Sequence, residues 1–74
     1  MTTMYCIAHK DDAEWLIGEI YDSSNWHAVK HQFYDFDVAR DAVNNGPKQY
    51  VLIKCPEDNG VRRYSQIIDT KIPA

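Results

Sequence analysis

Apolar and polar residues alternate through several short segments of this 74-residue chain, as they do in strands that bury one face. These segments are residues 4–9, 26–34, 50–55 and 61–68. Residues 50–55 carry apolar side chains on both faces, which predicts a strand in the middle of a sheet. Residues 61–68 contain arginine, serine and glutamine, and this polar content favours a strand at a sheet edge.

Residues 13–21 fit two kinds of structure. Ala13, Leu16 and Ile17 fall at helical spacing, and an acidic pair at the start of the segment could cap a helix. However, Gly18 would cost a helix interior about 1 kcal/mol. The tryptophan, isoleucines and tyrosine of the segment are also good strand formers. We therefore predict a strand over residues 13–21, with a helix as the alternative.

Residues 26–34 alternate imperfectly, with Val29, His31 and Phe33 on one face. The pattern predicts a strand whose other face is mostly solvated. Together with the two preceding segments, it predicts a three-stranded antiparallel meander over residues 4–34.

Residues 36–44 show the period of an amphipathic helix. Its apolar face consists of Phe36, Ala39, Ala42 and Val43. Asp35 or Asp37 can accept the free amides of the first turn, and both suit the positive end of the helix dipole. Residues 45–46, Asn-Gly, supply the left-handed residue that ends a helix, and Pro47 prevents its continuation.

These segments predict a small α+β domain. The expected order is β-β-β-α-β-β, an antiparallel sheet of about five strands with one helix packed on one face. The turn between the last two strands is expected at residues 56–60, where Asn59 and Gly60 favour positive φ angles. We predict a single domain over residues 1–74, with residues 69–74 as a short C-terminal tail.

Composition adds few constraints on function. The net charge is −3, and the acidic side chains concentrate near the N-terminus. They are Asp11, Asp12, Glu14, Glu19 and Asp22, against a single Lys10. Such asymmetry could orient a partner electrostatically, although a mixed solvated surface is the more ordinary explanation and the one that we prefer. No basic segment followed by an apolar run is visible, so we expect a cytoplasmic location and no membrane.

No metal, cofactor or catalytic constellation is evident. His27 and His31 are four residues apart, but on a strand this spacing is about 13 Å, too far to share an ion. Cys6 and Cys55 lie within predicted strands, which favours buried thiols over nucleophiles; a bridge between them requires neighbouring strands. So short a chain also leaves little room for a ligand-sized pocket. We therefore expect a protein that is not an enzyme.

A single-stranded nucleic-acid binder is one functional alternative. Basic residues and aromatics interleave on two strands that a tight turn would join. The residues concerned are Tyr50, Lys54, Arg62, Arg63 and Tyr64. The acidic net charge opposes this interpretation, because affinity for phosphates depends on a positive field.

Protein recognition is the function that we predict. Nine aromatic side chains exceed what so small a core can bury, and aromatics with arginine are enriched at the centres of interfaces. The candidate partner-binding residues are Trp15, Tyr21, Trp26, Arg62, Arg63 and Tyr64. A homodimer whose aromatics form its own interface is the other alternative.

In size, one-helix α+β layout and lack of a catalytic signature, the chain resembles small phage-encoded or mobile-element accessory proteins. Many of these inhibit a host enzyme or defence complex. The resemblance covers no specific residues and implies no site. It suggests an inhibitor or adaptor that acts on a host protein complex.

Overall fold

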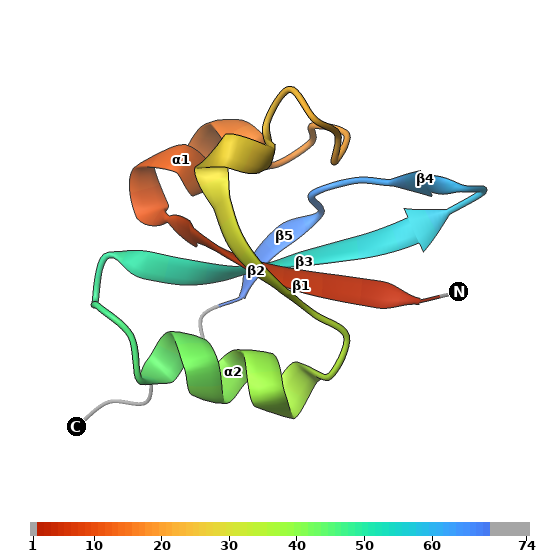
Figure 1. The fold of residues 1–74 in the computed structure, drawn as a ribbon. Helices are drawn as coiled ribbons and strands as arrows, with labels where there is room; N and C mark the ends of the chain where they lie inside the picture. The colour runs from red at the N-terminus through yellow and green to blue at the C-terminus, as the bar shows by residue number, and fades with distance from the viewer. Residues whose placement is uncertain (1, 69–74) are drawn as a thin grey trace.

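A computed structural model describes residues 2–68 and shows five strands, two helices and one 3₁₀ turn (Figure 1). In chain order the elements are β1 (Thr3–His9), α1 (Lys10–Leu16), the 3₁₀ turn η1 (Trp26–Ala28), β2 (Val29–Phe33), α2 (Phe36–Asn44), β3 (Tyr50–Asp58), β4 (Val61–Arg62) and β5 (Gln66–Ile68). The predicted α+β class is confirmed. The predicted tail at residues 69–74 lies outside the described residues.

The five strands form one curled antiparallel sheet with the order β2-β1-β3-β4, and β5 also pairs with β3. β3 therefore lies inside the sheet, as its two apolar faces predicted. It pairs along its length with β1, from Thr3 opposite Pro56 to His9 opposite Tyr50. β2 forms the edge beside β1.

The two helices lie on opposite sides of the sheet (Figure 1). α1 and the loop that follows it cover a core that we call the α1-side core. It consists of Met4, Cys6, Ala8, Ala13, Leu16, Ile53, Cys55 and Tyr64. α2 covers the α2-side core, which consists of Ile7, Ala39, Val43 and Leu52. β1 and β3 supply alternate residues to each core, so a single sheet is buried on both faces.

The predicted strand over residues 13–21 is wrong, because the chain forms α1 at Lys10–Leu16. The His9 side chain accepts a hydrogen bond from the Asp11 amide and caps the helix, while Ala13 and Leu16 bury its inner face. Gly18 does not destabilise the helix because it lies beyond the last turn, where its φ of 96° suits a glycine. Residues 4–34 are consequently not a three-stranded meander.

The predicted strand over residues 26–34 is shorter than expected and contains a bulge. Gln32 pairs with Cys6, but Lys30 pairs with Ile7, so His31 is an extra residue with a φ of 59°. The bulge reverses the alternation of the strand. As a result Val29 packs on the α1-side core while Phe33 packs on the α2-side core, although the sequence pattern placed both on one face.

α2 has the predicted aspartate cap and stops before Pro47. Its end lacks the predicted left-handed residue, because Asn45 has a φ of −90° and the positive-φ glycines among the described residues are Gly18 and Gly60. Asp35 accepts hydrogen bonds from the amides of Asp37 and Val38, and the helix ends at Asn44 before Pro47. β3 is longer than predicted and runs through Pro56 to Asp58, so the turn narrows to Asn59 and Gly60. Both of these residues have positive φ angles, 54° and 81°.

The predicted last strand over residues 61–68 is divided into β4 and β5. Between them Arg63 bridges to Ile20 in the loop after α1, and Tyr64 turns into the α1-side core. The amide of Tyr64 donates to the Glu19 carbonyl, and the Gly18 amide donates to the Tyr64 carbonyl. The amides of Arg63 and Ser65 still donate to the Pro56 and Lys54 carbonyls of β3, so Tyr64 is the residue that leaves the sheet pairing for the loop.

Candidate functional site

Aromatic side chains gather on the segment that contains α1, the following loop and η1. Trp15 and Trp26 are 47% and 50% exposed. The Trp15 ring stacks on the His27 ring with centroids 6.4 Å apart, and the Tyr21 and Trp26 rings are 5.7 Å apart. We call Trp15, Tyr21, Trp26 and His27 the aromatic surface. It contains three of the six residues that the sequence suggested for partner binding.

The aromatic surface is supported from within the molecule. The Tyr21 ring lies 5.7 Å from the Tyr64 ring, and the Gln32 amide donates to the Tyr21 hydroxyl. The Trp15 indole nitrogen donates to Asp12 over 3.0 Å. These contacts limit the rotamers of Trp15 and Tyr21, so less side-chain entropy remains to be lost when a partner binds.

Tyr64 is fully buried and is therefore not part of the exposed surface on which the sequence placed it. Its hydroxyl donates to the Asn25 side-chain oxygen over 2.7 Å. Asn25 is itself buried, and its side-chain amide nitrogen donates to the Ile20 carbonyl over 2.8 Å. Tyr64 and Asn25 thus hold the loop after α1 in place. Burial raises the pKa of Tyr64 most, and the nearby cysteines raise it further.

Arg62 and Arg63 bind the backbone of their own chain. The Arg62 guanidinium donates to the Cys55 carbonyl over 2.5 Å and pairs with Glu57 at 3.6 Å, and its side chain is only 15% exposed. The Arg63 guanidinium donates to the Gly18 carbonyl over 2.9 Å. Both arginines therefore have a structural role, because each connects its own strand segment to another segment of the fold.

The five residues of the nucleic-acid alternative do not share a surface. Tyr50 and Lys54 alternate with residues of the α1-side core and lie on the α2 side of the sheet, whereas Tyr64 is buried on the other side. These residues therefore do not form the strip of exposed aromatics between cations that would hold successive bases.

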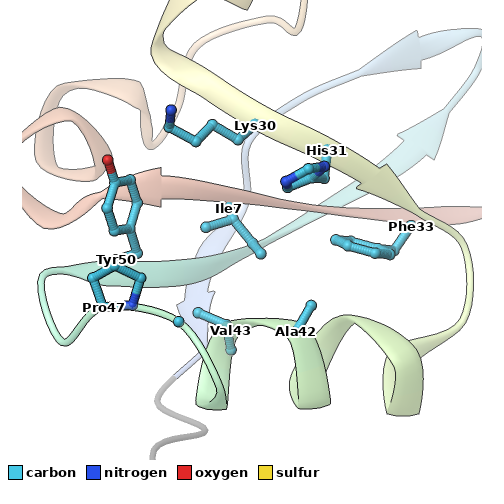
Figure 2. Close-up of a pocket in the computed structure, with 9 residues that line it drawn as sticks. Ile7, Lys30, His31, Phe33, Ala42, Val43, Pro47 and Tyr50 are labelled. Atoms are coloured by element: carbon cyan, nitrogen blue, oxygen red, sulfur yellow. The ribbon is translucent and has the colours of Figure 1, made fainter.

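A groove opens between β2 and the C-terminal end of α2 (Figure 2). Its volume is about 520 Å³, within the range of small-molecule sites, whereas the length of the chain led us to expect little room for a pocket of ligand size. Apolar side chains form its floor, among them Ile7, Phe33 and Val43. Lys30, His31 and Tyr50 stand at its margin, and the Lys30 ammonium lies 5.7 Å from the centre of the Tyr50 ring.

Sequence reasoning missed this groove because β2 gave no sign of its bulge. Lys30 and His31 are consecutive, and on a regular strand they would point to opposite faces. A histidine tolerates the left-handed conformation better than most residues. The presence of a histidine in the sequence does not by itself show that this residue adopts that conformation.

The two cysteines lie on neighbouring strands and are both free. Their sulfur atoms are 3.7 Å apart within the α1-side core. The hydrogen bond with Cys55 raises the pKa of Cys6 most, and burial raises it further. A thiol of this kind is a poor nucleophile because little thiolate is present.

Over residues 2–68 no group of three or more histidine, cysteine or acidic side chains could hold a metal ion. In the same part of the chain, neither helix is long or apolar enough to cross a membrane. Comparisons of the chain with protein-family models, with curated proteins and with solved structures found no match. The site is therefore interpreted from its own geometry.

Proposed function

We propose that the protein is a non-enzymatic module that binds another protein through the aromatic surface. The observation that carries this proposal is the joint exposure of Trp15 and Trp26, each about half accessible on a fixed support. Exposed tryptophans cost solvation free energy in a monomer, and tryptophan and tyrosine dominate binding energies at interfaces.

The charge around the aromatic surface indicates the character of the partner. Asp11 and Glu14 are exposed on α1, and Glu19 and Asp22 are exposed on the loop that follows. A rim of this sign favours a partner with basic residues around an apolar centre, because opposite potentials steer the encounter. It opposes the approach of a phosphate backbone, so we prefer a protein partner to a nucleic acid.

Inhibition and bridging are both consistent with this mode of action, since each requires only that a partner surface be occupied. The proposal places the protein in the cytoplasm, where free thiols such as Cys6 and Cys55 persist. A phage-type inhibitor or adaptor of a host complex remains our specific suggestion. It rests on size and layout.

Quantitative affinity capture from a lysate of the native host tests the proposal. The immobilised proteins are wild type, Trp26→Ser and the control Val38→Ser, which removes a side chain that is 53% exposed on α2. We expect wild type and Val38→Ser to retain a common protein that Trp26→Ser retains at least tenfold less, with unchanged melting temperatures. Equal retention by all three would refute the role of the aromatic surface.

The two alternatives have their own measurements. Fluorescence polarisation with a single-stranded oligonucleotide at low salt would favour nucleic acid if affinity fell with salt and with Lys54→Ala. Light scattering at micromolar concentration tests the homodimer. We expect no oligonucleotide binding and a monomer.

A further inference from the structure

The groove between β2 and α2 has a chemistry of its own. Its floor is apolar, and among the described residues the charged or titratable groups at its margin are Lys30, His31 and Tyr50 (Figure 2). Within residues 2–68 no carboxylate lines it, although the chain carries eleven acidic residues against eight lysines and arginines. A site that combines an apolar floor with basic groups in an acidic protein is complementary to an amphipathic anion.

The bulge in β2 creates this combination. Because His31 is an extra residue in the strand, Lys30 stands opposite Ile7 and faces the groove, and His31 also lines it. A regular strand would have turned one of the two away. Strained backbone of this kind persists at positions where it aims side chains at a site.

The Lys30 ammonium is available to an anion. It makes no ion pair with any carboxylate among the described residues, and it lies over the face of the Tyr50 ring. The Tyr50 hydroxyl and a ring nitrogen of His31 are further potential donors on the same margin. A carboxylate offers two acceptor oxygens, so it can accept hydrogen bonds from more than one of these donors at the same time.

The occupant that fits is a small molecule and not an added strand. β2 is an edge strand, but the left-handed residue at its middle interrupts the row of amides and carbonyls that an extended peptide would need. The groove instead offers a compact volume of about 520 Å³ between side chains.

We propose that this groove binds a small amphipathic carboxylate of the fatty-acid class. Its carboxylate lies between Lys30 and His31, and its hydrocarbon body lies on Ile7, Phe33 and Val43. The groove shares no residue with the aromatic surface, although His31 also lines a hollow beside Tyr21 and Trp26, and either proposal can fail while the other stands.

Titration of the full chain with decanoate, followed by amide NMR below the micelle-forming concentration, tests the proposal. We expect saturable shifts at Ile7, Phe33 and Val43. Decyltrimethylammonium, which has the same hydrocarbon length and the opposite charge, should give no saturable shifts there. Equal binding of the two amphiphiles, or no shift with decanoate, would overturn the proposal.

Variants of groove residues test whether decanoate contacts the charged margin and the apolar floor of the groove. Lys30→Met keeps the hydrocarbon stem, and His31→Asn keeps a residue that tolerates a positive φ. We expect each to weaken decanoate at least tenfold, and Ala42→Trp to abolish binding by filling the groove. Lys10→Met, on the other side of the sheet, should bind as wild type. Unchanged affinity of Lys30→Met and His31→Asn, both exposed and tolerant positions, would contradict the assignment.

Discussion

The two faces of the sheet are closed in different ways. On the α1 side a large side chain, Tyr64, inserts from the segment between β4 and β5, and its hydroxyl is satisfied by the buried Asn25. On the α2 side the buried helical contacts are small, Ala39 and Val43, and a groove of about 520 Å³ remains beside them. The aromatic surface therefore lies beside a core that is filled by a large side chain, whereas the groove lies beside a helix that contributes small ones.

This difference shows how a short chain can present two surfaces. A single sheet buried on both sides requires apolar residues at nearly every position of its central strands, and β1 and β3 provide them. The α2 side is filled mainly by small helical residues beside the groove. The α1 side also has hollows, of about 530 Å³ beside Tyr21 and Trp26 and about 560 Å³ beside Pro56 and Arg63.

Leu16→Ala should destabilise the protein by about 2–5 kcal/mol, because it deletes a fully buried side chain and leaves a cavity in the α1-side core. Val43→Ala on the α2 side should cost less, since it removes fewer atoms and its site adjoins an open groove. Urea unfolding followed by circular dichroism measures both. A larger loss for Val43→Ala would contradict the contrast between the faces.

Tyr64→Phe should lower the free energy of unfolding by about 1–3 kcal/mol, because the buried Asn25 oxygen loses its best donor. The Asp22 amide, at 3.4 Å, is a poor substitute. Tyr34→Phe is the matched control, because Tyr34 is exposed and should change stability by less than about 0.5 kcal/mol. Equal stabilities of the two variants would refute the structural role of Tyr64.

The stability of the protein should fall at alkaline pH. The pKa of Tyr64 is raised in the folded protein, so above the unfolded value of about 10 the unfolded chain releases its proton first. Stability is therefore fully present below that pH and is lost above it, with a slope of at most about 1.4 kcal/mol per pH unit for one proton. Cys6, whose pKa is also raised, contributes with the same sign.

Denaturant unfolding between neutral and strongly alkaline pH measures this slope. In Tyr64→Phe the free energy of unfolding should fall less steeply with pH above about pH 10. The part of the fall that is due to Cys6 should remain. A slope that is identical in wild type and Tyr64→Phe would assign the alkaline loss to other groups.

Asp35→Ala should destabilise α2 by about 1 kcal/mol, since it removes the acceptor of two first-turn amides. Asp37→Ala, which loses only an exposed ion pair with Arg40 at 3.5 Å, should have a smaller effect. Thermal unfolding distinguishes the two. If Asp37→Ala were the more damaging, Asp35 would not be the main cap.

The features predictable from sequence were those with local causes. α2 was found because its apolar period, its aspartate cap and its Asn-Gly-Pro end lie within a dozen residues. β3 was found because both of its faces are apolar. α1 was missed because strand-forming residues adjoin its end, and Gly18 lies outside a helix that the pattern extended too far.

The features that escaped prediction depend on distant partners. Tyr64 is buried because it meets Asn25, 39 positions earlier in the chain. The groove depends on a bulge at His31 whose register is set by β1. Of the suggested binding residues, Trp15, Tyr21 and Trp26 could be grouped from sequence because one segment carries them, whereas the arginines could not be separated from their structural contacts.

Partner capture by wild type, Trp26→Ser and Ala42→Trp side by side tests most directly whether the two faces have separate functions. We predict that Ala42→Trp, which blocks the groove, retains the captured protein at the wild-type level. We predict that Trp26→Ser, which alters the aromatic surface, loses it at least tenfold. Loss by Ala42→Trp together with full retention by Trp26→Ser would show that the partner binds the groove on the α2 side, and would contradict the function proposed for the aromatic surface.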